Sequence, residues 1–215
     1  MMRASRLFYA CALSLAALSL TAACGGAVIG DGGGDGGTSS NASGIGAPCV
    51  TQQEANPRFT GFIEQEVNVE TSTGEPSGAP VCLVNHFRGR VSCPYGQDSS
   101  GQGPQGAAGC RVAAGGAPVT GVAGQNGAAV QAQCVDRLAA DTVIRSCRCA
   151  NNSGRTDDGD NYCTCPGGMT CTPMISSIGG PTAHLAGSYC IKAGTLFDRA
   201  NACAAVCDPS GHTCP

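Results

Sequence analysis

The feature that most constrains this chain is its cysteine content, because 16 of its 215 residues are Cys. The rest of the composition offers little for a hydrophobic core, since only 4% of the residues are aromatic and there is no Trp. Such a core buries little apolar area per residue and offsets little of the conformational entropy lost on folding. Each disulfide typically contributes about 2–4 kcal/mol of stability. We therefore expect cross-links to substitute for core volume.

The N-terminal segment indicates the compartment. The first six residues carry Arg3 and Arg6 and no acid, and residues 7–23 are uncharged and rich in Leu and Ala. A basic start, an apolar stretch and small residues at its end are typical of a secretory signal peptide. The alternative, a transmembrane anchor, needs about 20 predominantly apolar residues, and this segment is shorter. Export makes a disulfide framework the natural interpretation of the cysteines.

The end of this leader, "TAAC" at residues 21–24, resembles the lipobox of bacterial lipoproteins. It departs from the usual pattern at Thr21, where Leu is commonest. The resemblance implies that 1-23 is a lipoprotein signal peptide and that Cys24 carries a diacylglycerol and usually an N-acyl chain. Two or more acyl chains give a stable membrane anchor. In the same family, Gly25 rather than Asp implies an outer-membrane or cell-surface location.

Cysteine parity bears on the same junction. If Cys11 leaves with the leader and Cys24 carries lipid, fourteen cysteines remain, an even number that allows seven disulfides. The alternative, ordinary cleavage after Ala23, leaves fifteen and one unpaired thiol. Parity therefore supports the lipoprotein interpretation. The predicted disulfide-forming residues are Cys49, Cys82, Cys93, Cys110, Cys134, Cys147, Cys149, Cys163, Cys165, Cys171, Cys190, Cys203, Cys207 and Cys214.

Composition divides the exported chain into a tether and a domain. Residues 24-48 are mostly Gly, Ser, Thr and Asn after the first Cys, which predicts a flexible coil. Residues 49-215 form one domain's worth of chain, with a Cys-dense sub-region at 146-215. We predict a mainly β, small disulfide-rich domain with short strands, long Gly-rich loops and one short C-terminal helix, over Asp198–Cys207.

Three stretches predict strands. Residues Ile63–Glu70 alternate between apolar and polar, which predicts a half-buried strand with its Glu residues, Glu64 among them, facing solvent. Val81–Gln97 predicts one strand, or two short strands bent at Gly89. The β-branched run Thr142–Ile144 favours a third strand.

The second of these stretches holds the candidate binding strip, His86, Arg88 and Arg90. Because side chains two apart in a strand share a face, Arg88 and Arg90 are predicted to point the same way, suited to a carboxylate or phosphate. The alternative is that both arginines pair with the Glu residues of the neighbouring strand and that His86 is an ordinary polar strand residue.

Two C-x-C pairs, Cys147/Cys149 and Cys163/Cys165, flank a polar loop. We predict that they lie on the two arms of a hairpin and form disulfides. A zinc site is the alternative, although structural zinc usually uses wider C-x₂₋₄-C spacing. A redox site is disfavoured because no C-x-x-C occurs.

The loop between these pairs contains Asp157, Asp158 and Asp160, the one calcium candidate in the chain. The pattern lacks the distant acidic residue of an EF-hand. Asp, Asn and Gly are also what tight turns select, so a plain turn is the preferred interpretation and no metal is expected.

No known catalytic signature stands in the sequence, so we expect no catalytic residues, and no cofactor apart from the lipid on Cys24. The formal net charge is −3 and there is no basic run, which argues against a nucleic-acid partner. We expect a membrane-anchored binding or structural module whose ligand is an extracellular protein or glycan. The alternatives are an enzyme without a recognisable motif and a protease-inhibitor-like module using Pro94-Tyr95 or Pro166-Gly168.

The chain as a whole resembles the Cys-rich surface lipoproteins of myxobacterial type. The resemblance rests on the junction at Cys24 and on the blocks "CLVNHFRGRVSCPYGQ" and "SCRC…YCTCPGG". It implies an envelope location and no particular activity.

Overall fold

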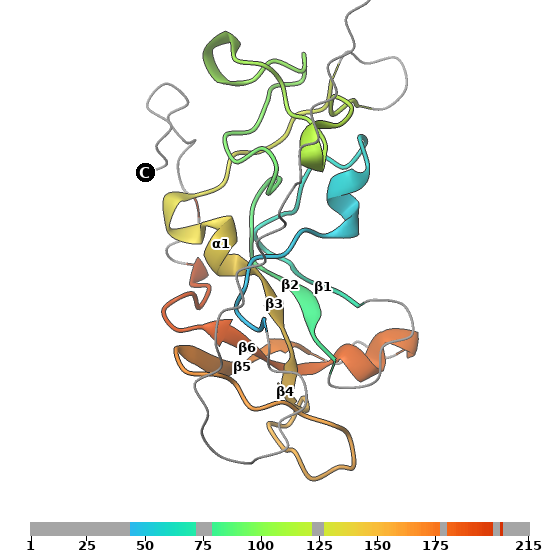
Figure 1. The fold of residues 1–215 in the computed structure, drawn as a ribbon, viewed down its shortest axis with the longest axis vertical. Helices are drawn as coiled ribbons and strands as arrows, with labels where there is room; N and C mark the ends of the chain where they lie inside the picture. Colours follow the sequence, from blue (N-terminus) through green and yellow to red (C-terminus); the bar gives the residue numbers. More distant parts are fainter. Residues whose placement is uncertain (1–43, 72–78, 122–126, 177–179, 200–202, 204–215) are drawn as a thin grey trace, which may run out of the picture. The chain divides into compact units, whose positions relative to one another are not determined.

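Two small antiparallel sheets carry the fold (Figure 1). The computed structural model describes residues 44–71, 79–121, 127–176, 180–199 and 203. The first sheet has the order β1-β2-β3 and the second β4-β6-β5. The strands are β1 (Val67–Glu70), β2 (Val81–Asn85), β3 (Val143–Ser146), β4 (Arg148–Ala150), β5 (Met169–Ile175) and β6 (Gly187–Lys192). The prediction of a mainly β, disulfide-rich domain is confirmed.

One short α-helix, α1 (Ala139–Thr142), leads directly into β3 within the described part of the chain. Short 3₁₀ turns lie at Gln52–Ala55, Pro104–Gly106, Ala113–Gly115, Val135–Arg137 and Gly180–Leu185. The predicted signal peptide, Cys24 and the tether up to residue 43 lie outside the described residues, as do Cys207, Cys214 and most of the predicted C-terminal helix. None of the helices in the described residues is long and apolar enough to cross a membrane.

Strand β2 is central because both of its faces are covered. Val81 and Leu83 pack against Tyr189 and Ile191 of β6, which joins the two sheets through one apolar cluster. On the opposite face Val84 packs with three other buried side chains, which are Phe62, Phe87 and Val143. A strand buried on both faces has a continuous apolar run in its sequence, and "VCLV" is such a run.

Two expectations about the edges of the first sheet need correction. Only the second half of the predicted Ile63–Glu70 strand is a strand, and Glu64 is 5% exposed rather than solvated. The backbone N–H of Glu66 donates to the carbonyl of Ile63, so the chain turns there and the alternation of faces ends. Residues 44–48, placed in the tether above, instead run along β3, where Gly46 N donates to Arg145 O at 2.8 Å.

Six disulfides cross-link the described residues. Twelve of the fourteen predicted cysteines take part, and each bridge joins segments 16 or more residues apart in the sequence. The pairs are Cys49–Cys82, Cys93–Cys110, Cys134–Cys203, Cys147–Cys163, Cys149–Cys171 and Cys165–Cys190. Three of these bridges lie in the second sheet and its loop, which is the Cys-dense region seen in the sequence.

Candidate binding groove beside the Cys93–Cys110 disulfide

A groove made of two adjoining hollows lies beside the Cys93–Cys110 disulfide. The hollows have volumes of about 290 and 420 Å³, and Tyr95 and Pro104 line both, so we call the whole depression the Tyr95 groove. The smaller hollow is also lined by Ser92, Cys93, Pro94, Gly96, Ala107, Ala108, Gly109, Cys110 and Arg111. The larger is also lined by Arg88, Gln97, Asp98, Gln102, Gly103, Ala129, Val130, Gln131 and Ala132.

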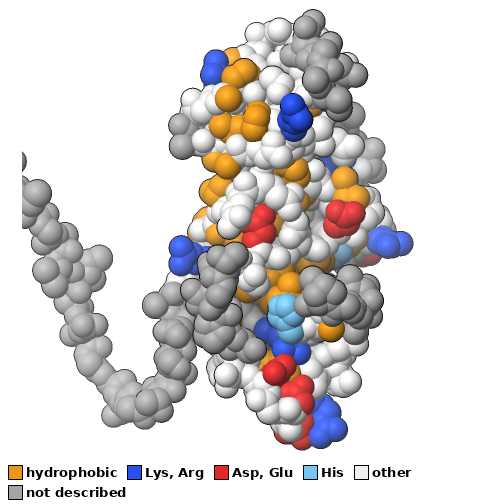
Figure 2. Space-filling view, turned by 90° about the vertical axis from the view of Figure 1, so that its right-hand side faces the viewer, with side chains coloured by type: hydrophobic (Ala, Val, Ile, Leu, Met, Phe, Trp, Pro, Cys, Tyr) orange, Lys and Arg blue, Asp and Glu red, His pale blue; other side chains and the backbone are white. Residues whose placement is uncertain are grey.

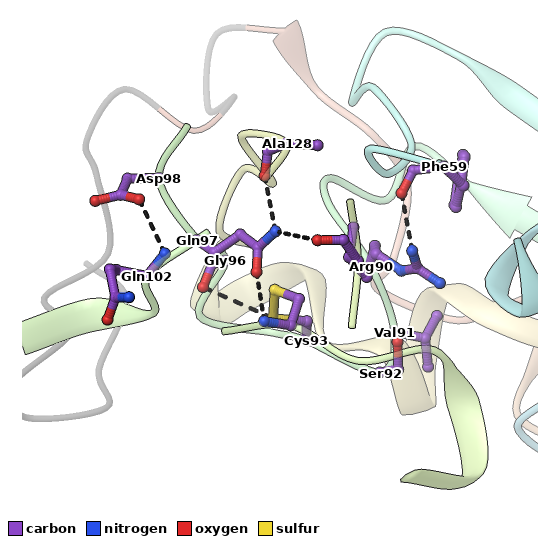
Figure 3. The surroundings of a disulfide bond; sticks show 12 residues. Phe59, Arg90, Val91, Ser92, Cys93, Gly96, Gln97, Asp98, Gln102 and Ala128 are labelled. Carbon is purple, nitrogen blue, oxygen red and sulfur yellow. Dashed lines mark hydrogen bonds between the residues drawn. A yellow bond between two sulfur atoms is a disulfide. The ribbon is translucent and has the colours of Figure 1, made fainter. Parts of the chain in front are cut away.

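The buried side chain of Gln97 ties the two walls of this groove together (Figure 3). Its amide nitrogen donates to the carbonyls of Val119, at 3.2 Å, and Ala128, at 2.8 Å. Its amide oxygen accepts a hydrogen bond from the backbone N–H of Cys110, next to the disulfide. Because all of these groups are buried, losing the amide would leave several of them unsatisfied. Gln97 therefore builds the groove rather than binding a ligand.

Two glycines allow the segment after Ala128 to approach the groove. Gly96 has φ +71°, and a Cβ there would lie 2.2 Å from the carbonyl oxygen of Val130. Gly89 has φ +86°, and its Cβ would lie 2.1 Å from the carbonyl oxygen of Gln131. Only Gly combines a left-handed backbone with such an approach. The walls are thus set by backbone-to-backbone packing.

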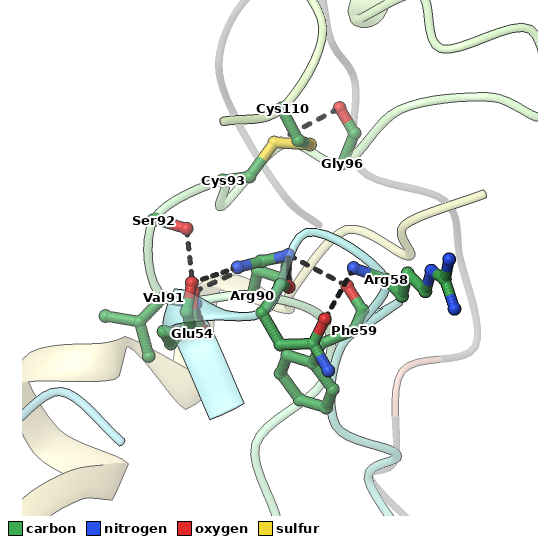
Figure 4. Close-up of polar contacts among 10 residues, drawn as sticks. Glu54, Arg58, Phe59, Arg90, Val91, Ser92, Cys93, Gly96 and Cys110 are labelled. Atoms are coloured by element: carbon green, nitrogen blue, oxygen red, sulfur yellow. Dashed lines mark hydrogen bonds and ion pairs between the residues drawn. A yellow bond between two sulfur atoms is a disulfide. The ribbon is translucent and has the colours of Figure 1, made fainter. Parts of the chain in front are cut away.

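A buried ion pair fixes the base of the same region (Figure 4). Arg90 Nε lies 3.2 Å from Glu54 Oε2, and both side chains are 0% exposed. The other guanidinium nitrogens of Arg90 donate to the carbonyls of Glu54, Asn56 and, at 2.8 Å, Phe59. The pair is therefore fully hydrogen-bonded, which is the condition for holding a charge pair in the interior.

The Glu54 carboxylate also accepts hydrogen bonds from two residues at the start of the groove wall. Val91 N donates to Oε1 at 2.8 Å and Ser92 Oγ donates to Oε2 at 2.7 Å. One side chain from the first 3₁₀ turn therefore holds three consecutive residues, Arg90 to Ser92, immediately before Cys93. This anchors the wall that carries Tyr95.

The structure separates the three residues of the predicted binding strip. Arg90 is buried in the ion pair, so the prediction that it shares an accessible face with Arg88 is wrong. The physical reason is that β2 ends at Asn85 and the chain turns at Gly89, which breaks the two-residue alternation. Arg88 does line the Tyr95 groove, where its Nε donates to Gln131 Oε1 at 2.8 Å.

His86 lies apart from the groove in an unusual backbone conformation. It has φ +50°, which is uncommon for a residue other than Gly, and its ring stacks on Phe197 with a centroid distance of 4.2 Å. Its Nδ1 is 2.9 Å from the carbonyl oxygen of Glu64. Burial is the main cause that lowers the pKa of His86 below 6.5. His86 thus joins segments within the fold.

The calcium candidates point to separate protein partners. Asp157 pairs with Arg155 at 2.6 Å, and Asp160 pairs with Arg148 at 2.8 Å. Asp158 accepts hydrogen bonds from the side-chain amide of Asn151 and the hydroxyl of Tyr162, and these hydrogen bonds lower its pKa to about 2. The loop that carries these carboxylates lies at the lower end of Figure 1. Figure 2 shows acidic and basic side chains next to one another at that end. The three carboxylates are thus occupied by partners within the loop and by Arg148 of β4.

Three clusters of possible metal ligands occur among the described residues, and cysteines already joined in disulfides dominate them. They are Cys147, Cys163 and Cys190; Cys149, Cys165 and Cys190; and Glu64, Cys134 and Cys203. A bridged sulfur has no thiolate to offer a metal. Of the predicted hairpin arms, Cys147 and Cys163 are joined directly, whereas Cys149 and Cys165 reach partners in β5 and β6.

Several groove residues lay outside the sequence-based prediction. Gln97 ends a stretch that predicts strands, and Gln102 and Gln131 lie in segments without a clear period, so nothing in their spacing marks them as groove residues. The sequence indicates Tyr95 only as part of the inhibitor-like Pro94-Tyr95 loop. An aromatic residue two positions after a bridged Cys is the one usable signal.

Together the sheets, the bridges and the groove define a class, a disulfide-stabilised, mainly β domain with a preformed surface depression. No known protein family, no curated protein and no solved structure matches the chain. The function is therefore argued from the site alone.

Proposed function

We propose that this chain is an exported, lipid-anchored binding module of the cell envelope and that the Tyr95 groove is its ligand site. The observation that carries the proposal is the way the groove is built. A disulfide, a buried amide network and a buried ion pair each hold one part of its walls.

Such construction matters for binding because ordering a site costs free energy at the moment of association. Each side chain or loop immobilised by a ligand subtracts from affinity, and a site ordered by its own fold avoids that cost. The groove floor of Ala, Gly and Pro residues has little side-chain entropy to lose. Concave sites with a few oriented polar groups are also the usual form of ligand sites.

The two alternatives fit this geometry less well. For an enzyme, the groove offers Ser92 hydrogen-bonded to Glu54 and Ser100 hydrogen-bonded to Asp98, but both carboxylates are already engaged. Glu54 is held by Arg90 and Val91, and Asp98 by the backbone N–H groups of Ser100 and Gln102. For an inhibitor, Pro94 and Tyr95 would have to present a convex loop, whereas they line a depression. A binding role is the function that accounts for both the concave shape and the internally held walls of the groove.

Titration of the lipidated mature chain, reconstituted in liposomes, against protein and polysaccharide fractions of a bacterial envelope tests the proposal. We expect saturable binding that is lost when Arg88→Ala and Tyr95→Ala are combined. Arg58→Ala is the matched control, because Arg58 is exposed and is not among the residues that line the groove. Absence of saturable binding to every fraction contradicts the proposal, as does binding that the double variant retains.

A further inference from the structure

We infer that the ligand of the Tyr95 groove is a carbohydrate, bound mainly in the larger hollow; this inference rests on the proposed function. The hollow places an aromatic side chain, Tyr95, next to groups that donate hydrogen bonds and groups that accept them. A sugar presents the complementary surface, a face of C–H groups edged by hydroxyls that both donate and accept.

The donors are oriented before any ligand arrives. Arg88 Nε is held by Gln131 Oε1, which leaves both terminal nitrogens of Arg88 without a partner among the described residues. A guanidinium presents its N–H groups in a fixed plane, so two of them bind neighbouring oxygens at once. The amide nitrogen of Gln131 adds a further donor beside them.

The acceptor side is oriented as well. Asp98 Oδ1 accepts from Ser100 Oγ at 2.6 Å and from the backbone N–H groups of Ser100 and Gln102. These bonds lower the pKa of Asp98, with the Ser100 hydroxyl the largest cause, so the carboxylate stays ionised at neutral pH. Its Oδ2 takes part in none of these three hydrogen bonds and is an acceptor for hydroxyls. Figure 3 shows Asp98 and Gln102 together, on the side of Gln97 away from Arg90.

The balance of charge separates a carbohydrate from other ligand classes. Arg88 and Asp98 give the larger hollow one charge of each sign, and they form no ion pair with each other in the described structure. A strongly anionic ligand would meet Asp98, and a purely apolar ligand would desolvate both charges without replacing their hydrogen bonds. A ligand rich in hydroxyls satisfies both charges.

The test is a printed oligosaccharide array, with a peptide array in parallel, probed with the lipidated mature chain in detergent, followed by calorimetry on the best oligosaccharide. We expect saturable oligosaccharide binding. Tyr95→Ala and Arg88→Ala are each expected to raise the Kd about tenfold or more, as substitutions at the centre of a site do. Tyr95→Phe keeps the ring and Arg58→Ala lies outside the groove, so both retain binding. Thermal unfolding shows whether each variant is folded.

The outcomes separate this inference from the proposed function. Groove-dependent binding to peptides and to no oligosaccharide overturns the carbohydrate inference and leaves the binding module standing. Oligosaccharide binding that Tyr95→Ala leaves unchanged, in a folded variant, also overturns it. Absence of binding on both arrays, together with no binding to envelope fractions, removes the proposed function as well.

Discussion

At the scale of single residues, Glu54 and Arg90 place two full charges in the interior of a small domain. Taking such charges out of water costs several kcal/mol per ion, and the pair is tolerated only because every remaining polar atom is matched. Here the guanidinium has carbonyl partners and the carboxylate accepts from Val91 and Ser92. Through these hydrogen bonds the pair fixes the position of the wall before Cys93.

Removing the charge of one partner in this buried pair is therefore expected to destabilise the fold strongly. Glu54→Gln keeps the shape but leaves Arg90 charged and unpaired, so we expect a loss of about 3–5 kcal/mol in the free energy of unfolding. Urea unfolding with the disulfides intact measures it. Glu66→Gln, at an exposed carboxylate, is the control and is expected to change stability by about 0.5 kcal/mol or less. Equal effects of the two substitutions would show that the buried pair has no special role.

Residue-scale prediction from the sequence was limited by what spacing can encode. Arg88 of the predicted binding strip lines the Tyr95 groove, whereas Arg90, predicted on the same strand face, is buried because the strand ends before it. A glycine in a sequence does not by itself indicate a positive φ. At position 89 the need for Gly becomes clear only from the carbonyl oxygen of Gln131, which a Cβ would meet. Long-range packing of this kind leaves no local pattern.

At the scale of elements, the loop Asn151–Tyr162 is ordered by its own side chains together with Arg148 of β4, although most of it is exposed. Asn151 accepts from the backbone N–H groups of Ser153 and Arg155 and donates to Asp158. Arg148, whose guanidinium lies 5.0 Å from the ring centroid of Tyr162, pairs with Asp160. Disulfides at Cys147–Cys163 and Cys149–Cys171 close its base.

Acid is expected to loosen this loop in a defined window. The pKa of Asp158 is about 2 in the fold against 3.8 ordinarily, because Asn151 and then Tyr162 donate hydrogen bonds to the ionised form. The stabilisation is therefore complete above about pH 4 and is lost as the pH falls through 2. Protection factors of the amides of residues 151–162, measured against the intrinsic exchange rate at each pH, are expected to fall over this range. Asp158→Asn is expected to remove that pH dependence, and a loop whose exchange ignores Asp158 would contradict the assignment.

Elements with strong local patterns were predictable and the rest were not. The β-branched run before Cys147 became β3, and the apolar run at Val81 became β2. The alternation over Ile63–Glu70 failed in its first half because Glu64 is needed inside, where it accepts from Cys203 N. The groove walls, being loops, carry Gly, Gln and Ala without a period, so their arrangement follows from bridges whose pairing the sequence does not encode.

At the scale of the whole molecule, small apolar clusters are linked by bridges instead of merging into one large core. The cluster at Val119 and Val130 contains Cys110, and another consists of Cys147, Cys149 and Cys190. Sulfur atoms thus make up part of the interior itself. This agrees with the expectation that cross-links replace core volume in a chain with few aromatic residues.

Mass spectrometry of the mature chain tests the predicted lipidation of Cys24 and the predicted disulfide bonds. We expect acyl lipid on Cys24 as the first residue, no free thiols, and two hydrogens missing for each of seven bridges. The six bridges of the described residues leave Cys207 and Cys214, which we predict pair with each other. Peptide mapping without reduction identifies that pair. An alkylatable thiol in the exported chain would contradict the predicted disulfide bonds. A mature chain that starts at Cys24 without acyl mass would contradict the predicted lipidation.

The neighbourhood of Cys190 has a consequence for biogenesis. Its sulfur lies 3.9 Å from that of Cys147 and 3.7 Å from that of Cys163, although it is bonded to neither. Proximity alone does not distinguish native from non-native partners among these sulfurs, so we expect early oxidation to produce some scrambled isomers there. Thiolate attack on a neighbouring bridge interconverts such isomers. We expect the producing cell, and any heterologous host, to require an isomerase that reshuffles bonds as well as an oxidase that creates them.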